Sequence, residues 1–313
     1  PALSSAQLVA LTTAQAAALT TAQVAALAPS QVAVMENADL AALGTAQIAA
    51  MSSAQLAALS SSQLRSLTAA QVKAIETADL AALSANQVNK LSTAQIQALT
   101  SAQLEALTTA QVESLTTAQV AALTSAQIQS LEAADVAALT AAQIVALSSA
   151  QVAALKATQL AALTVDQIAA LETVDLAAIS ALLIPSLTSD QVAALTTAQV
   201  SALTTAQVAA LETADLVALS ADQIVALRPA QVAALTTAQI AELEVADLQG
   251  MSSAQLVALT TAQVRALSPS QIAALGTAQV RSLEAADFAV LTSDQLAALS
   301  TAQIQALSTA QII

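Results

Sequence analysis

Seven pairs of carboxylate residues, each a Glu followed three residues later by an Asp, are the feature of this sequence that most resembles a chemical site. The pairs are Glu36 and Asp39, Glu76 and Asp79, Glu132 and Asp135, Glu172 and Asp175, Glu212 and Asp215, Glu244 and Asp247, and Glu284 and Asp287. Oxygen atoms of carboxylates are preferred ligands of Ca²⁺, so one interpretation is a ladder of cation sites. Each pair offers too few oxygens for Ca²⁺, which takes about six to eight, and no Gly-bearing loop accompanies it. We therefore predict no metal site and no cofactor.

The rest of the composition argues against catalysis and against nucleic-acid binding. The sequence contains no His, Cys, Tyr or Trp, and its Ser and Thr residues have no base beside them that could activate a hydroxyl. Seven Lys and Arg residues against 21 Asp and Glu residues give a formal net charge of −14, which repels phosphate groups. We therefore expect a protein that is not an enzyme and does not bind nucleic acid.

A strict eight-residue period positions all of these residues. Every eighth residue from Leu3 to Leu307 is Leu, Met or Ile, which gives 39 copies of a word close to Leu-Thr-Thr-Ala-Gln-Val-Ala-Ala. We call each copy an octad and label its positions a to h, starting at the Leu. Such a short internal repeat is typical of a solenoid, in which each unit becomes stable only by packing on its neighbours.

Each octad carries the signals of a helix start. Position b is Ser or Thr in 27 octads and position e is Gln in 31, the spacing of a capping box in which each side chain binds the backbone N–H of the other residue. Pro29, Pro229 and Pro269 lie at position c, which becomes the first helical residue, where Pro is favoured. Gly44 and Gly276 lie at b, where Gly is an accepted N-cap. The Glu and Asp pairs also occupy b and e, so we interpret them as a capping box with the long and short side chains exchanged.

The period excludes one rival fold and disfavours another. In one continuous helix each octad would rotate by about 80° beyond two turns, so no apolar stripe would form for a coiled coil. A β-solenoid would need Gly, Asn or Asp at its tight corners, and the chain has only three Gly. We predict an all-α fold, an α-solenoid of very short helices with one helix per octad and about two to four octads per turn.

The pattern also assigns faces to the positions. We expect a and f to form the core, small Ala residues at d and h to fill the space between them, and g, which includes Arg65 and Lys73, to face solvent. The whole range 1–313 is expected to be a single array and an elongated monomer. Because it starts at Pro1 and stops one residue short of a full word, we expect an excerpt of a longer array. Its apolar runs are too short for a membrane span.

A few octads depart from the word. In the octad that contains Ser180, Leu182 and Leu183 replace Ala and Gln, and Pro185 stands where a helical N–H is expected. We expect a local kink there, with an exposed Leu182–Ile184 run as a possible contact surface. Lys156 and Arg228 occupy b, where we interpret them as tolerated substitutions.

Words such as Leu195-Thr-Thr-Ala-Gln-Val-Ser-Ala202 resemble the octapeptide arrays of very large bacterial surface proteins of the haem-utilisation or adhesion type. The resemblance implies a stalk that is extracellular or on the cell surface. It does not imply a haem site here, because the sequence has no His or Cys and Met35, Met51 and Met251 fall at core position a.

These observations favour a structural spacer or adhesin-like stalk segment. The alternative is a solenoid scaffold that binds a protein or peptide, and a third hypothesis is binding of ice or polysaccharide through the Ser and Thr residues at c. A protein or a cell-surface ligand is the expected partner class. Binding solenoids usually carry aromatic or Arg hot spots on one face, whereas Phe288 is the only aromatic residue and lies at core position f. The spacer is therefore the leading hypothesis.

Overall fold

The computed structural model describes residues 3–312. Within this range the chain forms 39 short helices, 38 of them α-helices and one a 3-10 helix, and no strand. The helices belong to two compact units that divide between Ala162 and Leu163. The prediction of an all-α solenoid of very short helices, one per octad, is confirmed.

The first unit contains α1 to α20. Their bounds are α1 Ser5–Val9, α2 Thr13–Ala17, α3 Thr21–Ala25, α4 Pro29–Val32, α5 Asn37–Ala42, α6 Thr45–Ala49, α7 Ser53–Ala57, α8 Ser61–Ser66, α9 Ala69–Lys73, α10 Thr77–Ala81, α11 Ala85–Asn89, α12 Thr93–Ala98, α13 Ser101–Glu105, α14 Thr109–Glu113, α15 Thr117–Ala122, α16 Ser125–Ser130, α17 Ala133–Ala138, α18 Ala141–Val145, α19 Ser149–Val152 and α20 Ala157–Ala162.

The second unit contains α21 to α38 and the 3-10 helix η1. Their bounds are α21 Val165–Ala170, α22 Thr173–Ala178, η1 Ala181–Ser186, α23 Ser189–Ala193, α24 Thr197–Ala202, α25 Thr205–Ala210, α26 Thr213–Val217, α27 Ala221–Val225, α28 Pro229–Ala234, α29 Thr237–Glu242, α30 Val245–Gly250, α31 Ser253–Val257, α32 Thr261–Ala266, α33 Pro269–Ala274, α34 Thr277–Ser282, α35 Ala285–Val290, α36 Ser293–Ala297, α37 Thr301–Ala306 and α38 Thr309–Ile312.

After a six-residue helix, two residues with extended or nearly extended backbone lead into the next helix. Leu123 at position a ends α15 with φ −60° and ψ 140°, and Thr124 at position b precedes α16 with φ −75° and ψ 158°. Residues 3–312 contain no cis peptide bond and no residue with positive φ. The chain therefore changes direction at every octad without the left-handed residue that commonly ends a helix, and so it needs almost no Gly.

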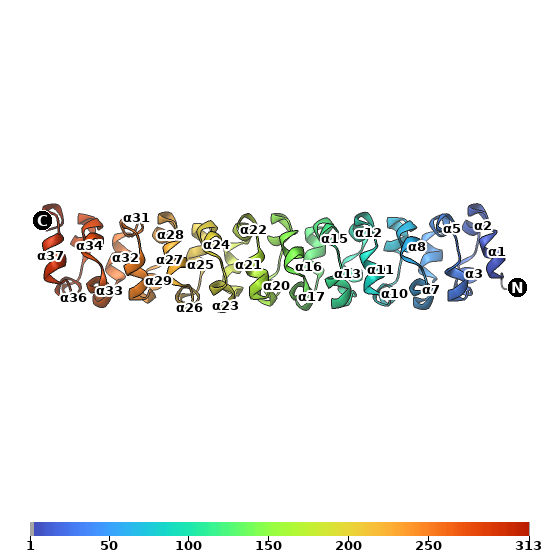
Figure 1. The fold of residues 1–313 in the computed structure, drawn as a ribbon, viewed down its shortest axis with the longest axis horizontal. Helices are drawn as coiled ribbons and strands as arrows, with labels where there is room; N and C mark the ends of the chain where they lie inside the picture. Colours follow the sequence, from blue (N-terminus) through green and yellow to red (C-terminus); the bar gives the residue numbers. More distant parts are fainter. Residues whose placement is uncertain (1–2, 313) are drawn as a thin grey trace. The chain divides into compact units, whose positions relative to one another are not determined.

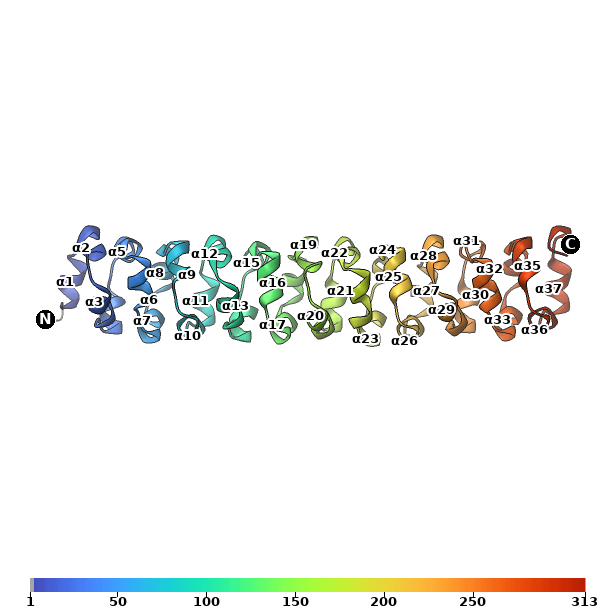
Figure 2. The same cartoon turned by 180° about the vertical axis from the view of Figure 1, so that it is seen from behind.

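Within each unit, taken by itself, the helices follow one another along one axis (Figures 1 and 2). Inside each unit, helices pack on the helix three octads later, for example α9 on α12 and α17 on α20 in the first unit, and α32 on α35 in the second. This spacing places three to four octads in each turn of the coil, which lies within the predicted range.

The core consists of positions a and f, as predicted. Leu64 at f is 0% exposed and Leu67 at a is 3% exposed, and both values are typical of their positions along the chain. Position g faces solvent, as Arg65 shows. The packing role expected for Ala at position d is wrong, because d lies on the surface; Val174 at d is 61% exposed. Position e, where Gln predominates, turns inward instead.

The irregular octad forms η1, a 3-10 helix that contains Pro185. The sequence correctly located the defect, but the expected exposed apolar run is wrong. Ile184 occupies core position f and is 1% exposed, whereas Leu182 occupies surface position d and is 90% exposed. The octad thus keeps its core residue but forms a different helix type, and with Leu183 at position e it has no capping-box Gln.

None of the helices formed by residues 3–312 has both the length and the apolar character needed to cross a membrane.

Candidate functional site

The Gln side chain at position e carries out two tasks at once, and α14 illustrates both. The Oε1 atom of Gln111 accepts a hydrogen bond of 2.7 Å from the backbone N–H of Thr108, while the N–H of Gln111 donates to the Thr108 hydroxyl at 3.3 Å. This reciprocal pair is the predicted capping box. It gives the N–H of Thr108 a partner, and it gives the N–H of Gln111 an acceptor in addition to the Thr108 carbonyl oxygen.

The amide nitrogen of the same side chain reaches a different turn of the coil. Nε2 of Gln111 lies 2.7 Å from the carbonyl oxygen of Leu83, 3.1 Å from that of Leu80 and 3.3 Å from that of Ala81. These carbonyls lie at and just after the end of α10, four octads earlier. The last carbonyls of any helix lack intrahelical partners, so Gln111 supplies donors for the end of α10 as well as a cap for the start of α14.

The same arrangement repeats along both units. Nε2 of Gln55 donates to Val24 and Leu27, at 2.9 and 2.7 Å. Nε2 of Gln231 donates to Val200 and Leu203, at 2.9 and 2.8 Å. We call each such contact a glutamine rung. It explains why Gln111 is only 1% exposed although it is polar, since a buried amide is stable only when its hydrogen bonds are made.

Sequence reasoning assigned this Gln to the cap alone and missed the second contact. The available signal was the choice of Gln over Glu at position e in 31 octads. Either residue can accept the N-cap N–H in a capping box, but only Gln has an N–H₂ group that can donate.

Seven Asp residues take the place of this Gln at position e, and we call each of them an aspartate rung. The seven side chains are between 2% and 8% exposed, so they turn inward as Gln does. An ionised Asp has no N–H to donate. Two of the Asp side chains instead accept from a hydroxyl at position c three octads earlier: Thr109 donates to Oδ1 of Asp135 at 3.0 Å, and Ser189 donates to Oδ1 of Asp215 at 2.8 Å. Ser53 donates to Asp79 in the same way.

We expected Glu at b and Asp at e to form a capping box with the long and short side chains exchanged, and the Glu half of this expectation is wrong. None of the seven Glu side chains at position b forms a hydrogen bond to the start of its helix in the described part of the chain. Asp247 and Asp287 do accept from the N–H of Glu244 and Glu284, at 3.3 and 3.0 Å. The long Glu side chain extends into solvent, whereas the short Asp at the third helical position is held beside the backbone.

The aspartate rungs place carboxylates in surroundings that disfavour their charge. Burial raises the pKa of Asp135 above its ordinary value of 3.8, and the hydrogen bond from Thr109 opposes this shift only in part. Burial likewise raises the pKa of Asp247 and of Asp287, partly offset by the backbone N–H that each accepts. In Asp39 and Asp215, the Oδ2 atom is buried without a hydrogen-bond partner.

Arg228 is more than the tolerated substitution that we expected. Its Nη2 atom donates to the carbonyl of Leu203 at 3.0 Å, which lies three octads earlier, and its backbone N–H is capped by Oε1 of Gln231 at 2.6 Å. The guanidinium therefore adds a contact between turns at a position where Ser and Thr bind only their own helix.

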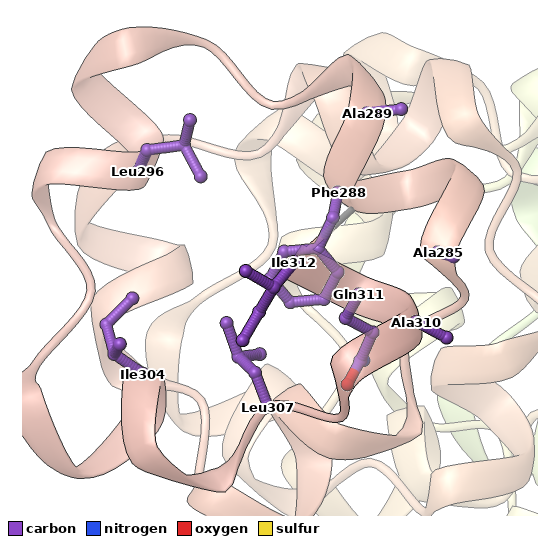
Figure 3. Close-up of a pocket in the computed structure, with 9 residues that line it drawn as sticks. All are labelled: Ala285, Phe288, Ala289, Leu296, Ile304, Leu307, Ala310, Gln311 and Ile312. Carbon is purple, nitrogen blue, oxygen red and sulfur yellow. The ribbon is translucent and has the colours of Figure 1, made fainter.

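A cavity of about 410 Å³ lies among the last helices of the second unit. Figure 3 shows that Phe288, Ile304 and Leu307 contribute to an apolar lining, in which Gln311 supplies the amide group. Among its lining residues there is no acid, base or nucleophile. The cavity offers apolar contact without the groups that a reaction would need.

Within residues 3–312, no three His, Cys, Asp or Glu side chains come together in an arrangement that could hold a metal ion. Met35, Met51 and Met251 lie in the core at position a, with exposed fractions of 3% to 4%. The most organised polar groups in the described part of the chain are therefore the rungs. The Gln contacts, and those of Asp79, Asp135 and Asp215, join one turn of the coil to another.

Comparison with known families gives a match over nearly the whole chain. The ALTTAQ repeat model matches ten overlapping or adjacent segments: residues 1–29, 32–71, 72–109, 101–133, 128–165, 168–205, 208–245, 240–277, 272–301 and 280–313. No curated protein matches the chain. The matched word is the same one that builds the capping boxes and rungs, and the chain belongs to the ALTTAQ repeat family.

Proposed function

We propose that this chain is a structural spacer, or adhesin-like stalk segment, without catalytic activity. The observation that carries the proposal is the use of the polar side chains. In Gln111 the Oε1 atom and the Nε2 atom are both engaged, one at the start of its own helix and one at the end of α10. A side chain held at both ends stabilises the coil and is not free to act on a substrate.

The rungs suit a spacer because they make each added octad equivalent to the last. Each unit grows by repeating one contact with the helix three octads away and one hydrogen-bonded contact with the helix four octads away. Stability in such arrays is approximately a sum of repeat and neighbour contributions, so their length can change without redesign of a core. A binding scaffold is less well supported, because Phe288 is 9% exposed and so offers no aromatic anchor on the surface.

A location outside the cell or on its surface belongs to the same proposal. It is supported by the resemblance of the octads to the arrays of large bacterial surface proteins. A stalk in that setting would hold a protein or cell-surface ligand at a distance set by the number of octads.

Distances between spin labels test whether the array acts as a spacer whose length is set by the number of octads. The chain has no Cys, so two cysteines introduced at exposed g positions of the first unit would be the only labelled residues. One variant replaces Arg65 and Gln97, which are four octads apart, and the other replaces Arg65 and Gln129, which are eight octads apart. A spacer should give narrow distance distributions, with the second mean about twice the first. Broad distributions, or a second distance no longer than the first, would reject the spacer.

A further inference from the structure

The aspartate rungs lack the donor that every glutamine rung uses. In the register of the glutamine rungs, Nε2 binds the carbonyls 31 and 28 residues earlier, as Gln263 does with Val232 and Leu235 at 2.9 and 2.6 Å. The same register places Leu216 and Leu219 opposite Asp247. An ionised Asp has no hydrogen to donate to these carbonyls.

Burial makes this substitution costly for the charged form. Asp135, Asp247 and Asp287 are 3%, 5% and 2% exposed. A buried carboxylate is destabilised unless it is paired or fully hydrogen-bonded. In two further members of the same class, Asp39 and Asp215, one buried oxygen has no hydrogen-bond partner at all. Asp39 and Asp215 therefore each hold a buried acceptor atom that has no donor.

We propose that Asp135, Asp247 and Asp287 are proton-linked rungs. Each takes one proton from solvent, which forms an O–H bond on the carboxyl group and removes its negative charge. The protonated carboxyl then donates to the carbonyls at the end of the helix four octads earlier, as the Gln amide does. Acidification thus ties together turns of the coil that are less tightly joined at neutral pH.

The sign of the linkage follows from the raised pKa values. Burial raises the pKa of all three groups above 3.8 in the folded chain. A group with a raised folded pKa contributes stability that is fully present below its unfolded pKa and is lost as the pH rises through its folded pKa. The three rungs should therefore favour the folded chain more strongly at mildly acidic pH than at neutral pH.

The charged groups around the three rungs are mostly acidic and do not neutralise them. Each Asp has the Glu of its own octad beside it, and the Glu132, Glu244 and Glu284 charges raise the pKa of their Asp partners. Other titratable or charged residues lie on the helices packed against the rungs, on the helices four octads away within the same unit, or at the starts of those helices. They are Glu105, Glu113 and Lys156 around Asp135; Glu212, Asp215, Asp222 and Arg281 around Asp247; and Arg265 around Asp287.

A matched pair of triple variants in the full chain tests the proposal. The first variant is Asp135→Asn, Asp247→Asn and Asp287→Asn, which keeps the shape of the three side chains and removes their titration. The control is Asp190→Asn, Glu242→Gln and Asp294→Asn, which removes the same amount of charge from three exposed positions. Urea unfolding of the native chain and both variants is followed between about pH 7.5 and pH 4.5, and the Asp carboxyl groups of the native chain are titrated by ¹³C NMR.

The native chain and the exposed-site control should both gain resistance to urea as the pH falls. The buried-site variant should lose part of that gain, and it should already unfold at a higher urea concentration than the native chain at pH 7.5. The three buried carboxyls should titrate above the ordinary Asp value of 3.8. Equal pH dependence in the two variants, or buried carboxyls that titrate at or below 3.8, would overturn the proposal.

Discussion

Glutamine rungs and aspartate rungs occupy the same position of the octad but connect different turns of the coil. Nε2 of Gln111 donates to α10, four octads earlier, whereas Asp135 accepts from Thr109 of α14, three octads earlier. The Gln contact uses backbone carbonyls, which every octad has. The Asp contact needs a hydroxyl at position c. Position e therefore couples turns in general, and its side chain decides which pair of turns is joined.

The difference also shows which group of the position-e side chain contacts the end of another helix. Both kinds of rung retain a contact with the N-cap backbone, as Gln111 does with Thr108 and Asp287 does with Glu284. Only the Gln side chain adds a donor for the end of another helix. Its amide thus replaces the left-handed Gly that caps many helix ends.

Removing a core side chain should lower the free energy of unfolding more than any other change proposed here. The size of this loss should not depend on the kind of rung in the octad. Leu67→Ala deletes a side chain that is 3% exposed, and it should reduce the free energy of unfolding by about 2 to 5 kcal/mol through lost burial and the cavity left behind. Arg65→Ala in the same octad changes an exposed side chain and should stay within about 0.5 kcal/mol. Urea denaturation compares the two, and equal losses would show that the faces are misassigned.

Converting an aspartate rung into a glutamine rung should be stabilising. In the double variant Glu76→Thr and Asp79→Gln, the new amide can donate to the carbonyls of Ile48 and Met51 by the register of the other rungs. The hydrogen bond from Ser53 is lost in exchange. A net gain of about 0.5 to 1.5 kcal/mol is expected at neutral pH, the usual value of one hydrogen bond.

The control for that gain is the double variant Glu105→Gln and Glu113→Gln, which removes two exposed charges from the same unit. It should change the urea midpoint less than the rung conversion does. If the control stabilised the chain equally, the gain would come from reduced repulsion between acids rather than from the new rung.

Calcium should have the smallest effect. The carboxylate pairs provide fewer oxygens than the six to eight or so that Ca²⁺ prefers. Thermal unfolding with millimolar Ca²⁺ should match unfolding in Na⁺ of equal ionic strength, since salt of any kind screens an acidic surface. Stabilisation specific to Ca²⁺ that disappears when Glu172 and Asp175 and their counterparts become Thr and Gln would show that the pairs bind cations.

The parts of this fold that depend on one octad could be predicted from the sequence. The capping box of Thr108 and Gln111, the first-position Pro229 and the core residue Leu67 all follow from contacts within a few residues or from burial. The surface location of Val174 did not follow, because Ala at this position fits both a buried and an exposed helix face.

The contacts between turns could not be predicted, because identical octads give no clue to which copies meet. The partner of the Gln111 amide is set by how far the coil advances in each turn, and that depends on packing of side chains that recur in all octads. Without the partner helix in view, the buried state of Asp135 and its bond to Thr109 could not be inferred either. The sequence located the acidic octads but not the direction in which their Asp residues face.

Hydrogen exchange after Gln111→Glu tests the coupling of turns most directly. The substitution keeps the side-chain length and the oxygen that accepts from Thr108, and it removes the N–H₂ group that binds Leu80 and Leu83. At neutral pH, backbone amides near the end of α10 should lose protection as much as those of α14, although they lie about four octads away in sequence. Loss of protection confined to residues 107–114, with α10 unchanged, would show that Gln is only a cap and would contradict the role of the rungs.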